Sequence, residues 1–169
     1  MTVAFRDGQR GDGGAVSALF CKAFTATFGN LYSIENLAMM LAERTPAAFE
    51  ARLGSSDWAF RLAEEDGVLI GYATGGENEL PGDLLGPTWE LHHLYLDEAA
   101  KGRGIADVLF AWVCDEARRR NYHYLQLSVF VDNHRARRFY EKHGLEEVGK
   151  YVFMVGNHED DDRVMRLKL

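Results

Sequence analysis

Residues 101–106, with the sequence KGRGIA, combine two glycines and two basic side chains between two apolar segments. The segment before them, 89–96, is apolar and strand-like, whereas apolar residues recur at helical spacing over 105–119. A strand that turns through glycines into a helix directs backbone N–H groups and the positive end of the helix dipole toward one point. Glycine allows the unusual dihedral angles of such a turn and leaves room for a ligand. The pattern therefore predicts a phosphate or pyrophosphate site, to which Lys101 and Arg103 add positive charge.

Two common nucleotide-binding motifs do not match this turn. A Walker loop ends in G-K-[ST], whereas this chain has Gly104-Ile105-Ala106 at that place. A dinucleotide-binding fingerprint requires a third glycine, where this chain has Val108 or Leu109. The turn is therefore either another class of phosphate site or a plain loop with basic residues on its surface.

A second motif lies in residues 133–145, NHRARRFYEKHGL. Lys101-x-x-Gly104-x-Ala106 resembles the [QR]-x-x-G-x-[GA] pyrophosphate loop of the GCN5-related N-acetyltransferase (GNAT) family, which binds acetyl-CoA, with lysine at the first place. Residues 133–145 are similar to that family's N-x-x-A-x-x-x-Y-x-x-x-G-F, with Leu145 in place of phenylalanine. The resemblance extends over nearly the whole chain and is weakest before Trp58.

The order of predicted elements indicates an α+β domain with one βαβ crossover. The length favours a single domain over residues 1–169, and the family resemblance implies that it is a single N-acetyltransferase domain. The family resemblance implies a mixed, mostly antiparallel central sheet flanked by helices, with a splayed strand pair and one βαβ acetyl-CoA-binding unit. The predicted helices are 12–27, one capped by Ser33, one starting at Thr45-Pro46, 105–119, and one capped by Asp132 or Asn133 and ended by Gly144. The predicted strands are 58–63, 68–74, 89–96, 124–131, 148–155 and 164–169, with a turn at 65–67.

The resemblance also implies which residues contact acetyl-CoA, the expected co-substrate. The main chain of the strand before the turn pairs with the pantetheine arm, and the turn itself holds the pyrophosphate. Asp107 is expected to point away from the phosphates or to cap the helix, because its charge repels them. The implied contacts are Leu94, Tyr95, Leu96, Lys101, Gly102, Arg103, Gly104, Ile105, Ala106, Asp107, Asn133 and Tyr140.

Transfer of an acetyl group to nitrogen requires a neutral amine, so a base must remove a proton from an ammonium group. Glu90 is the first candidate for this base, and its alternative role is an ion pair at the strand end. Alternation along the strand predicts Glu90, His92 and Leu94 on one face and residues 91, 93 and 95 on the other. His92 is a candidate proton relay or a lining residue of the acceptor site, and His93 is a weaker one.

Tyr140 matches the family tyrosine that gives a proton to the leaving thiolate or hydrogen-bonds the sulfur, and its alternative role is a core aromatic residue. Asn133 serves as a helix cap, as a cofactor contact, or as both. Ser128 stands where some ribosomal-protein acetyltransferases have a glutamate base, which argues against that variant of the mechanism.

Three segments indicate the acceptor. AFTATFGNLYSIENLAMML, ELHHLYL and YVFMVGNHEDDDRVM resemble the PaiA-like branch, bacterial enzymes that acetylate spermidine and spermine. Acidic residues at 77, 79, 83 and 159–162 are suited to attract a polycation, or they are solvated loop residues, and the stretch 75–87 is expected to be a loop. Aromatic residues at 24, 28, 32 and 58 either line the acceptor pocket or fill the core. The favoured acceptor is a polyamine; the alternatives are a protein N-terminus or lysine, and a catalytically weak acyl-CoA-binding regulator.

Composition limits the other partners. The formal net charge of −7 argues against nucleic acid, whose phosphates require basic residues. No apolar run approaches the roughly 20 residues that a bilayer requires, and residues 1–10 lack the apolar core of a secretory signal. Cys21 and Cys114 are expected to be free thiols in a reducing cytoplasm. No metal site is expected, because the histidines show no ligand spacing with Cys or carboxylates. By resemblance, the chain is expected to act on a small-molecule amine and is able to form a homodimer.

Overall fold

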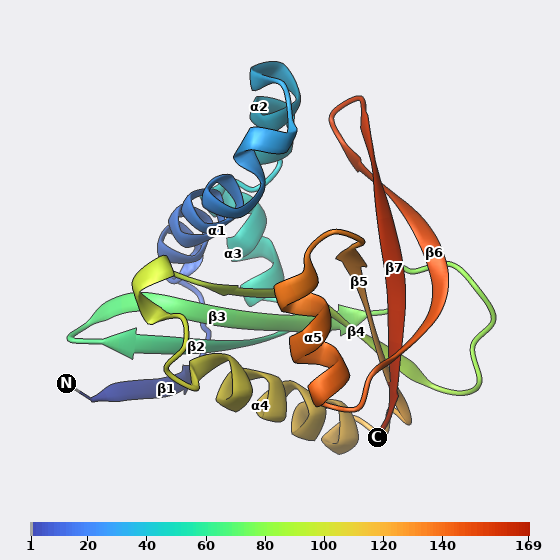
Figure 1. Cartoon of the computed structure of the whole chain (residues 1–169). Helices are drawn as coiled ribbons and strands as arrows, with labels where there is room; N and C mark the ends of the chain where they lie inside the picture. The colour runs from blue at the N-terminus through green and yellow to red at the C-terminus, as the bar shows by residue number, and fades with distance from the viewer. Residues whose placement is uncertain (1) are drawn as a thin grey trace.

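The computed structural model describes residues 2–169, and a seven-stranded sheet forms its centre (Figure 1). The strand order is β1-β2-β3-β4-β5-β7-β6. Every neighbouring pair is antiparallel except β4 and β5, which are joined through a helix and are therefore parallel. This arrangement confirms the predicted α+β class with one βαβ unit. The strands are β1 Val3–Asp7, β2 Ala59–Glu65, β3 Val68–Glu77, β4 Thr88–Leu96, β5 Tyr124–Phe130, β6 Glu146–Val155 and β7 His158–Lys168.

The helices form two layers around this sheet. Figure 1 shows α1 (Gly13–Phe28), α2 (Ile34–Ala42) and α3 (Pro46–Leu53) on one side and α4 (Ile105–Arg119) on the other, with α5 (His134–Lys142) in front of β5. Two short 3₁₀ turns, η1 (Gly29–Leu31) and η2 (Glu98–Ala100), complete the set. The side chains of Ser33, Thr45 and Asn133 accept hydrogen bonds from the first-turn N–H groups of α2, α3 and α5, as predicted from their types.

Each helix layer packs on its own hydrophobic core. On the α4 side, Trp89 and Leu109 are completely buried together with the β5 side chain Leu125. On the α1 side, Phe20 and Tyr72 belong to the second core, which joins α1 and α3 to β2 and β3. The sheet therefore separates two hydrophobic cores. A cavity for ligands is expected where two of its strands part.

The sheet strands β4 and β5 diverge from each other. These strands pair only at Thr88–Tyr124, Trp89–Leu125 and Glu90–Gln126. Beyond Glu90, β4 continues to Leu96 with partners on β3 alone. The predicted splayed pair is thus present, and one main-chain edge of β4 is left for another partner.

Three elements differ from the sequence prediction. β1 was not predicted; it is a short edge strand whose position is fixed by β2, with Arg6 of β1 paired to Asp12 and Glu64. β7 begins at His158 instead of residue 164, because hydrogen bonding to β6 extends through the acidic run. β3 also continues to Glu77, so the loop before β4 is shorter than expected.

Candidate active site

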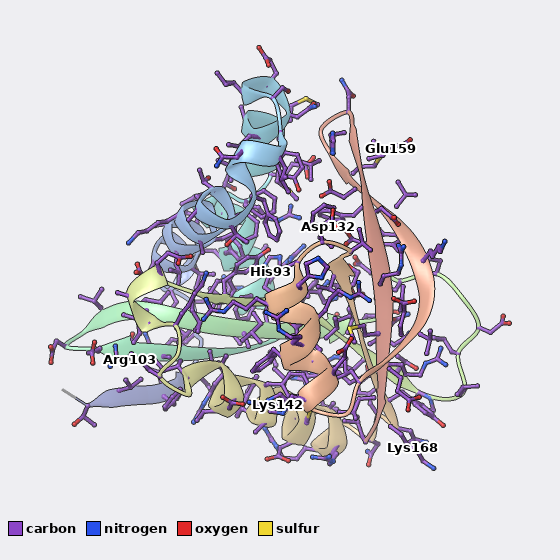
Figure 2. The ribbon with its side chains drawn as sticks, viewed as in Figure 1. His93, Arg103, Asp132, Lys142, Glu159 and Lys168 are labelled. Carbon is purple, nitrogen blue, oxygen red and sulfur yellow. The ribbon has the colours of Figure 1, made fainter. Side chains whose placement is uncertain are left out.

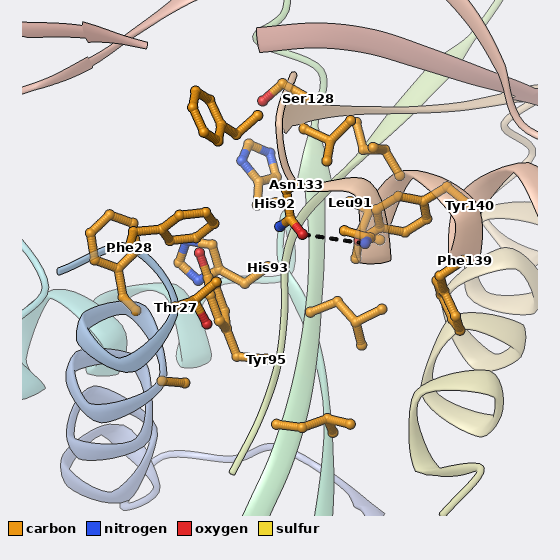
Figure 3. A pocket seen from close by; sticks show the side chains of 18 of the residues that line it. Thr27, Phe28, Leu91, His92, His93, Tyr95, Ser128, Asn133, Phe139 and Tyr140 are labelled. Atoms are coloured by element: carbon orange, nitrogen blue, oxygen red, sulfur yellow. Dashed lines mark hydrogen bonds between the residues drawn. The ribbon is translucent and has the colours of Figure 1, made fainter. Parts of the chain in front are cut away.

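One cavity of about 600 Å³ lies at the opening between β4 and β5. In Figure 3, residues of α1 (Thr27, Phe28) lie on one side of β4, and residues of α5 (Phe139, Tyr140) lie on the other. The cavity extends from the glycine turn at one end to side chains of β6 and β7 at the other. The cavity therefore joins the predicted cofactor site to a second region, lined by β6 and β7, that is a candidate for the acceptor site.

The glycine turn has the geometry of an anion site. Gly102 and Gly104 have φ angles of +75° and +79°, which residues with a side chain rarely adopt. Gly104 is the N-cap of α4 and provides no side-chain cap, so the first-turn N–H groups of Ile105, Ala106 and Asp107 have no capping acceptor. All but one residue of 101–107 line the cavity. An uncapped helix N-terminus beside a free strand edge fits the pyrophosphate and the amide-bearing arm of acetyl-CoA.

The charged side chains of the turn point in different directions. The Arg103 guanidinium binds both carboxylate oxygens of Glu65, at 2.6 and 3.2 Å, and does not line the cavity (Figure 2). The Arg103 side chain therefore binds β2 instead of adding charge to the turn. Only the backbone of Arg103 remains a candidate contact for the cofactor. Lys101 lines the cavity and pairs with Glu98.

Asp107 is held away from the turn by α5. Its Oδ1 accepts hydrogen bonds from Lys142 Nζ at 3.0 Å and from His143 Nε2 at 2.9 Å. These bonds lower the pKa of the Asp107 carboxyl, with the Lys142 bond as the largest cause. The expectation that this carboxylate avoids the phosphates agrees with its position.

β4 contains a bulge that the sequence pattern did not reveal. Thr74 of β3 pairs with His93, and the next β3 residue, Gly75, pairs with Leu91. His92 is therefore the extra residue of β4 and has no partner of its own on β3. Strict alternation cannot continue through such a residue.

The predicted faces of β4 are consequently wrong beyond the bulge. Leu94 packs in the α4-side core with Leu91, whereas alternation placed it beside Glu90. His93 and Tyr95 turn instead toward the α1-side core, where both rings lie against Phe20. The bulge thus directs polar rings toward α1 and keeps the free edge of β4 beside the cavity.

Glu90 lines the cavity and is only 7% exposed. Its Oε2 accepts a hydrogen bond from the Glu79 backbone N–H at 2.8 Å. Burial raises the pKa of the Glu90 carboxyl to about 7, although that hydrogen bond opposes the shift. A group with this pKa changes its protonation state near neutral pH, as a general base must.

His92 lies beside Glu90 but is oriented by other groups. Its Nε2 lies 3.0 Å from the Glu77 carbonyl oxygen, which requires a proton on Nε2. The ring also lies 4.6 Å from the ring of Trp58, and burial lowers the pKa of His92. Nε2 is 3.6 Å from Glu90 Oε2, beyond hydrogen-bonding distance. His92 is thus a neutral ring at the cavity wall with its Nδ1 lone pair free.

His93 is placed in the core. Its Nδ1 lies 2.9 Å from the Tyr72 hydroxyl, and burial holds its pKa well below the ordinary range. His93 is therefore a neutral, fixed ring between the helices and β4.

Tyr140 and Asn133 reach the cavity from α5 and its cap (Figure 3). The Tyr140 ring packs on Phe110 and Phe139, with centroids 6.0 and 5.4 Å apart. Burial raises the pKa of the Tyr140 phenol above its ordinary value, so the phenol carries its proton at neutral pH. Asn133 caps α5 with its side-chain oxygen while it lines the cavity, so both of its predicted roles are compatible with the structure.

The sequence reasoning did not separate the residues that close the far end of the cavity. Asp160 and Asp162 of β7 are 4% and 5% exposed, although they belong to a run that also suits a solvated loop. Tyr32, before α2, hydrogen-bonds Asp160, and Tyr151 of β6 lines the same end. Alternation along the strand could have identified Asp160 and Asp162 as a pair, because residues two apart on a strand share a face.

Metal-binding clusters and membrane-spanning helices are both absent from the part of the chain that the structure describes. Residues 2–169 contain no group of three or more His, Cys, Asp or Glu placed to hold a metal ion. They also contain no helix with the length and apolar character needed to cross a bilayer.

Comparisons with known proteins agree with this geometry. The model of the acetyltransferase (GNAT) family matches residues 20–145. An uncharacterized N-acetyltransferase of Lactobacillus delbrueckii subsp. lactis is 27% identical over 157 residues, 90% of this chain and 89% of the relative.

Solved structures share the fold over the full length. The PaiA N-acetyltransferase from Thermoplasma acidophilum in complex with coenzyme A covers 100% of both chains, with a TM-score of 0.82 and 18% identity. The ribosomal-protein-S18-alanine N-acetyltransferase from Escherichia coli covers 99% of this chain and 94% of its own, with a TM-score of 0.72 and 15% identity. At these identities the likeness shows the fold and does not select an acceptor.

The family model covers more than half of the chain, and the glycine turn, the free edge of β4 and the uncapped end of α4 meet at one cavity. The chain belongs to the GNAT family of acetyl-CoA-dependent N-acetyltransferases.

Proposed function

We propose that this enzyme acetylates a primary amine of a small polycation, a polyamine such as spermidine or spermine. One observation carries the proposal: besides Asp107 at the glycine turn, four carboxylates, those of Glu79, Glu90, Asp160 and Asp162, line the same cavity. An acceptor with several ammonium groups is attracted by such a lining, whereas a neutral acceptor is not.

The far end of the cavity is closed by contacts that suit a small acceptor. The Tyr32 hydroxyl donates a hydrogen bond to Asp160, and the Phe28 and Phe130 rings lie 6.4 Å apart in an edge-to-face arrangement. The Asn157 N–H also donates to Asn36 Oδ1 at 2.9 Å, which links the β6–β7 hairpin to α2. A peptide acceptor requires an open groove, so these links favour a small amine over a protein.

Acetyl-CoA supplies the activated thioester for this reaction. We assign its pyrophosphate to the backbone N–H groups of 102–107 and its arm to the main chain of Leu94, Tyr95 and Leu96. Lys101 adds a positive charge beside the phosphates, and Asn133 faces the arm from the cap of α5. These assignments rest on the positive-φ glycines, the uncapped helix and the free strand edge.

The catalytic roles follow from protonation states. The Glu90 carboxylate takes a proton from the acceptor's ammonium nitrogen, which frees the lone pair that forms the amide bond. The Tyr140 phenol, kept protonated by burial, gives its proton to the sulfur as the carbon–sulfur bond breaks. His92 lines the path between the acceptor and Glu90. The net change is one amide bond formed, one thioester broken and one proton released.

Release of the CoA thiol from acetyl-CoA tests the proposal. Spermidine, spermine, putrescine, an aminoglycoside and lysine-bearing peptides are offered separately. Preferential turnover of spermidine or spermine is the expected result. Turnover of peptides alone would assign the enzyme to protein acetylation, and acetyl-CoA binding without turnover of any amine would favour an acyl-CoA-binding regulator.

A further inference from the structure

Two buried carboxylates on β7 each have one oxygen without a hydrogen-bond partner among the described residues. Asp160 and Asp162 are 4% and 5% exposed, and Oδ1 of each has no hydrogen-bond partner among residues 2–169. The other oxygen of Asp160 accepts the Tyr32 hydroxyl. A buried carboxylate oxygen without a partner is costly, so such a group usually has a ligand or a catalytic role.

No lysine or arginine side chain of residues 2–169 forms a salt bridge with this pair. Among residues 2–169, the single nitrogen of a basic residue within 4.0 Å of either carboxylate is His158 Nε2, 3.2 Å from Asp160 Oδ1. Arg163, the neighbouring cation on β7, pairs with the exposed Asp161. By contrast, two of the three arginines that line the cavity, Arg44 and Arg52, stack on the rings of Phe20 and Trp58, and the third, Arg135, belongs to α5.

Arg52 serves the other end of the cavity. Its charge lowers the pKa of Glu90 and its own charged state is favoured by Glu79, so those two acidic groups have a cation nearby. No lysine or arginine among residues 2–169 forms a salt bridge with the pair on β7, although the charge of Arg163 opposes the rise in the pKa of Asp162 that burial causes. The charge of the pair is therefore available to a cation that enters the cavity.

The walls around the pair suit the hydrocarbon part of such a cation. Asp162 pairs with Tyr151 of β6 and Phe130 of β5, and Asp160 pairs with Phe153. Cross-strand partners share a face, so these three rings border the carboxylates, and all three line the cavity. Aromatic rings around acidic groups are favourable for alkylammonium ions, through apolar contact and cation–π attraction.

The pair and Glu90 lie on the same face of the sheet at a defined separation. Glu90 pairs with Gln126, and Asp162 pairs with Phe130, four residues farther along β5. Four is an even number, so both pairs face the same side, about 13 Å apart along the strand at about 3.3 Å per residue, and Glu90 and Asp162 lie two strands apart across the sheet. Tyr151 of β6 lines the same cavity: burial raises its pKa most, and the negative charges of Glu90 and Asp162 are the next causes.

We propose that Asp160 and Asp162 form a subsite for a second ammonium group of the acceptor, which holds that group while the primary amine lies at Glu90. The inference rests on the proposed function. It adds which residues select a polyamine and which length of polyamine they favour. The carboxylates of the subsite bind the distal nitrogen, and the rings of β5 and β6 contact the methylenes between the two nitrogens. The separation favours a long diamine, a triamine or a tetramine over a short diamine.

A pair of substrates that differ only in the distal nitrogen tests this subsite. Octylamine and 1,8-diaminooctane have the same carbon chain, and one of them lacks the second ammonium group. We expect kcat/KM of the wild type to be about 10- to 100-fold higher for the diamine, and this preference to fall toward 1 in Asp162→Asn and in Asp160→Asn. Asp161→Asn is the matched control, because Asp161 is exposed on the opposite face of the same strand.

The possible outcomes of this experiment distinguish failure of the subsite from failure of the proposed function. A wild type that acetylates both substrates equally, or variants that lose activity on both in the same proportion, would overturn the subsite and leave polyamine acetylation in place. A wild type that acetylates peptides but no small amine would overturn the proposed function and the subsite together. Acetyl-CoA affinity and Tm, measured for every variant, separate a lost subsite from a lost fold.

Discussion

Replacement of Glu90 by glutamine changes catalysis and stability in opposite directions if the carboxylate is the base. Glutamine retains an oxygen that accepts the Glu79 N–H, but it cannot take a proton. We expect kcat to fall by about 10²- to 10⁴-fold, the usual contribution of a general base. The loss of a buried negative charge should at the same time stabilise the fold.

The magnitude and sign follow from the pKa of Glu90, which burial raises from 4.5 to about 7. The folded protein binds the proton more tightly than the unfolded chain, so the protonated carboxyl favours folding. That contribution is fully present below pH 4.5 and is lost as the pH rises through 7. The whole shift corresponds to about 3 kcal/mol of unfolding free energy, which wild-type protein lacks at pH 8 relative to pH 4.

The assay is urea unfolding of wild type and Glu90→Gln at pH 4.5 and pH 8, with kcat/KM for the acceptor followed over the same range. We expect the two proteins to differ little at pH 4.5 and the variant to be more stable by up to about 3 kcal/mol at pH 8. The groups that face Glu90 are Glu79, Arg52, His92 and Tyr151, and they are the same in both proteins.

Asp162, whose pKa is raised to about 7 by burial and by the charge of Asp160, titrates in the same range. The difference between variant and wild type therefore isolates Glu90, where a single pH profile does not. Glu77→Gln, at an exposed position on the end of β3, is the control for glutamine substitution. A Glu90→Gln protein that keeps wild-type kcat, or that is less stable than wild type at pH 8, would refute the reasoning.

Three further substitutions test the cofactor end and the proton donor. Tyr140→Phe is expected to lower kcat by about 10- to 100-fold with little change in the dissociation constant of acetyl-CoA, measured by titration calorimetry; a weakened affinity with normal kcat would contradict the donor role. Gly104→Ala places a side chain at φ +79°, at a cost of about 1–2 kcal/mol, and should raise KM for acetyl-CoA about 10-fold. Gly67→Ala, at φ +77° in the β2–β3 turn, should show the same loss of stability with normal KM. Arg103→Ala should leave KM for acetyl-CoA within about twofold, because its guanidinium binds Glu65, and a tenfold rise would show that the side chain turns to the phosphates on binding.

The cofactor half of the site was predictable because its signals are local. The turn requires positive φ at particular positions, and glycine is the residue that supplies it at 102 and 104. The caps Ser33, Thr45 and Asn133 are also decided within one helical turn, and the structure contains all three. Such features depend on three or four consecutive residues, which a single sequence displays in full.

The faces of β4 were not predictable for the opposite reason. The bulge at His92 results from pairing with β3, where Gly75 lies against the Trp89 ring and Gly76 lies against Trp58. Those contacts join residues that are distant in sequence, and nothing in ELHHLYL itself marks the extra residue. The prediction for Leu94 failed at this point, because one inserted residue exchanges every face after it.

The acidic run at 159–162 shows how tertiary pairing overrides residue preference. Aspartate is disfavoured in strands, so EDDD indicates a loop, yet β6 pairs with it residue by residue. Pairing separates the run into Glu159 and Asp161 on the exposed face, with Glu159 on the β6–β7 hairpin in Figure 2, and Asp160 and Asp162 on the cavity face. A loop would let all four charges reach water, and a strand cannot.

That separation is the strongest reason to look for a ligand at this end of the cavity. Two carboxylates two residues apart repel each other, and burial adds to this cost, as the raised pKa of Asp162 shows. A fold that needed only a hairpin here would be more stable with threonine or valine at both positions. The chain instead keeps the charges, places no lysine or arginine of residues 2–169 in a salt bridge with them, and surrounds them with Phe130, Tyr151 and Phe153. The stability that the apo enzyme forgoes is recovered when a cationic acceptor binds, because the acceptor brings the missing positive charge.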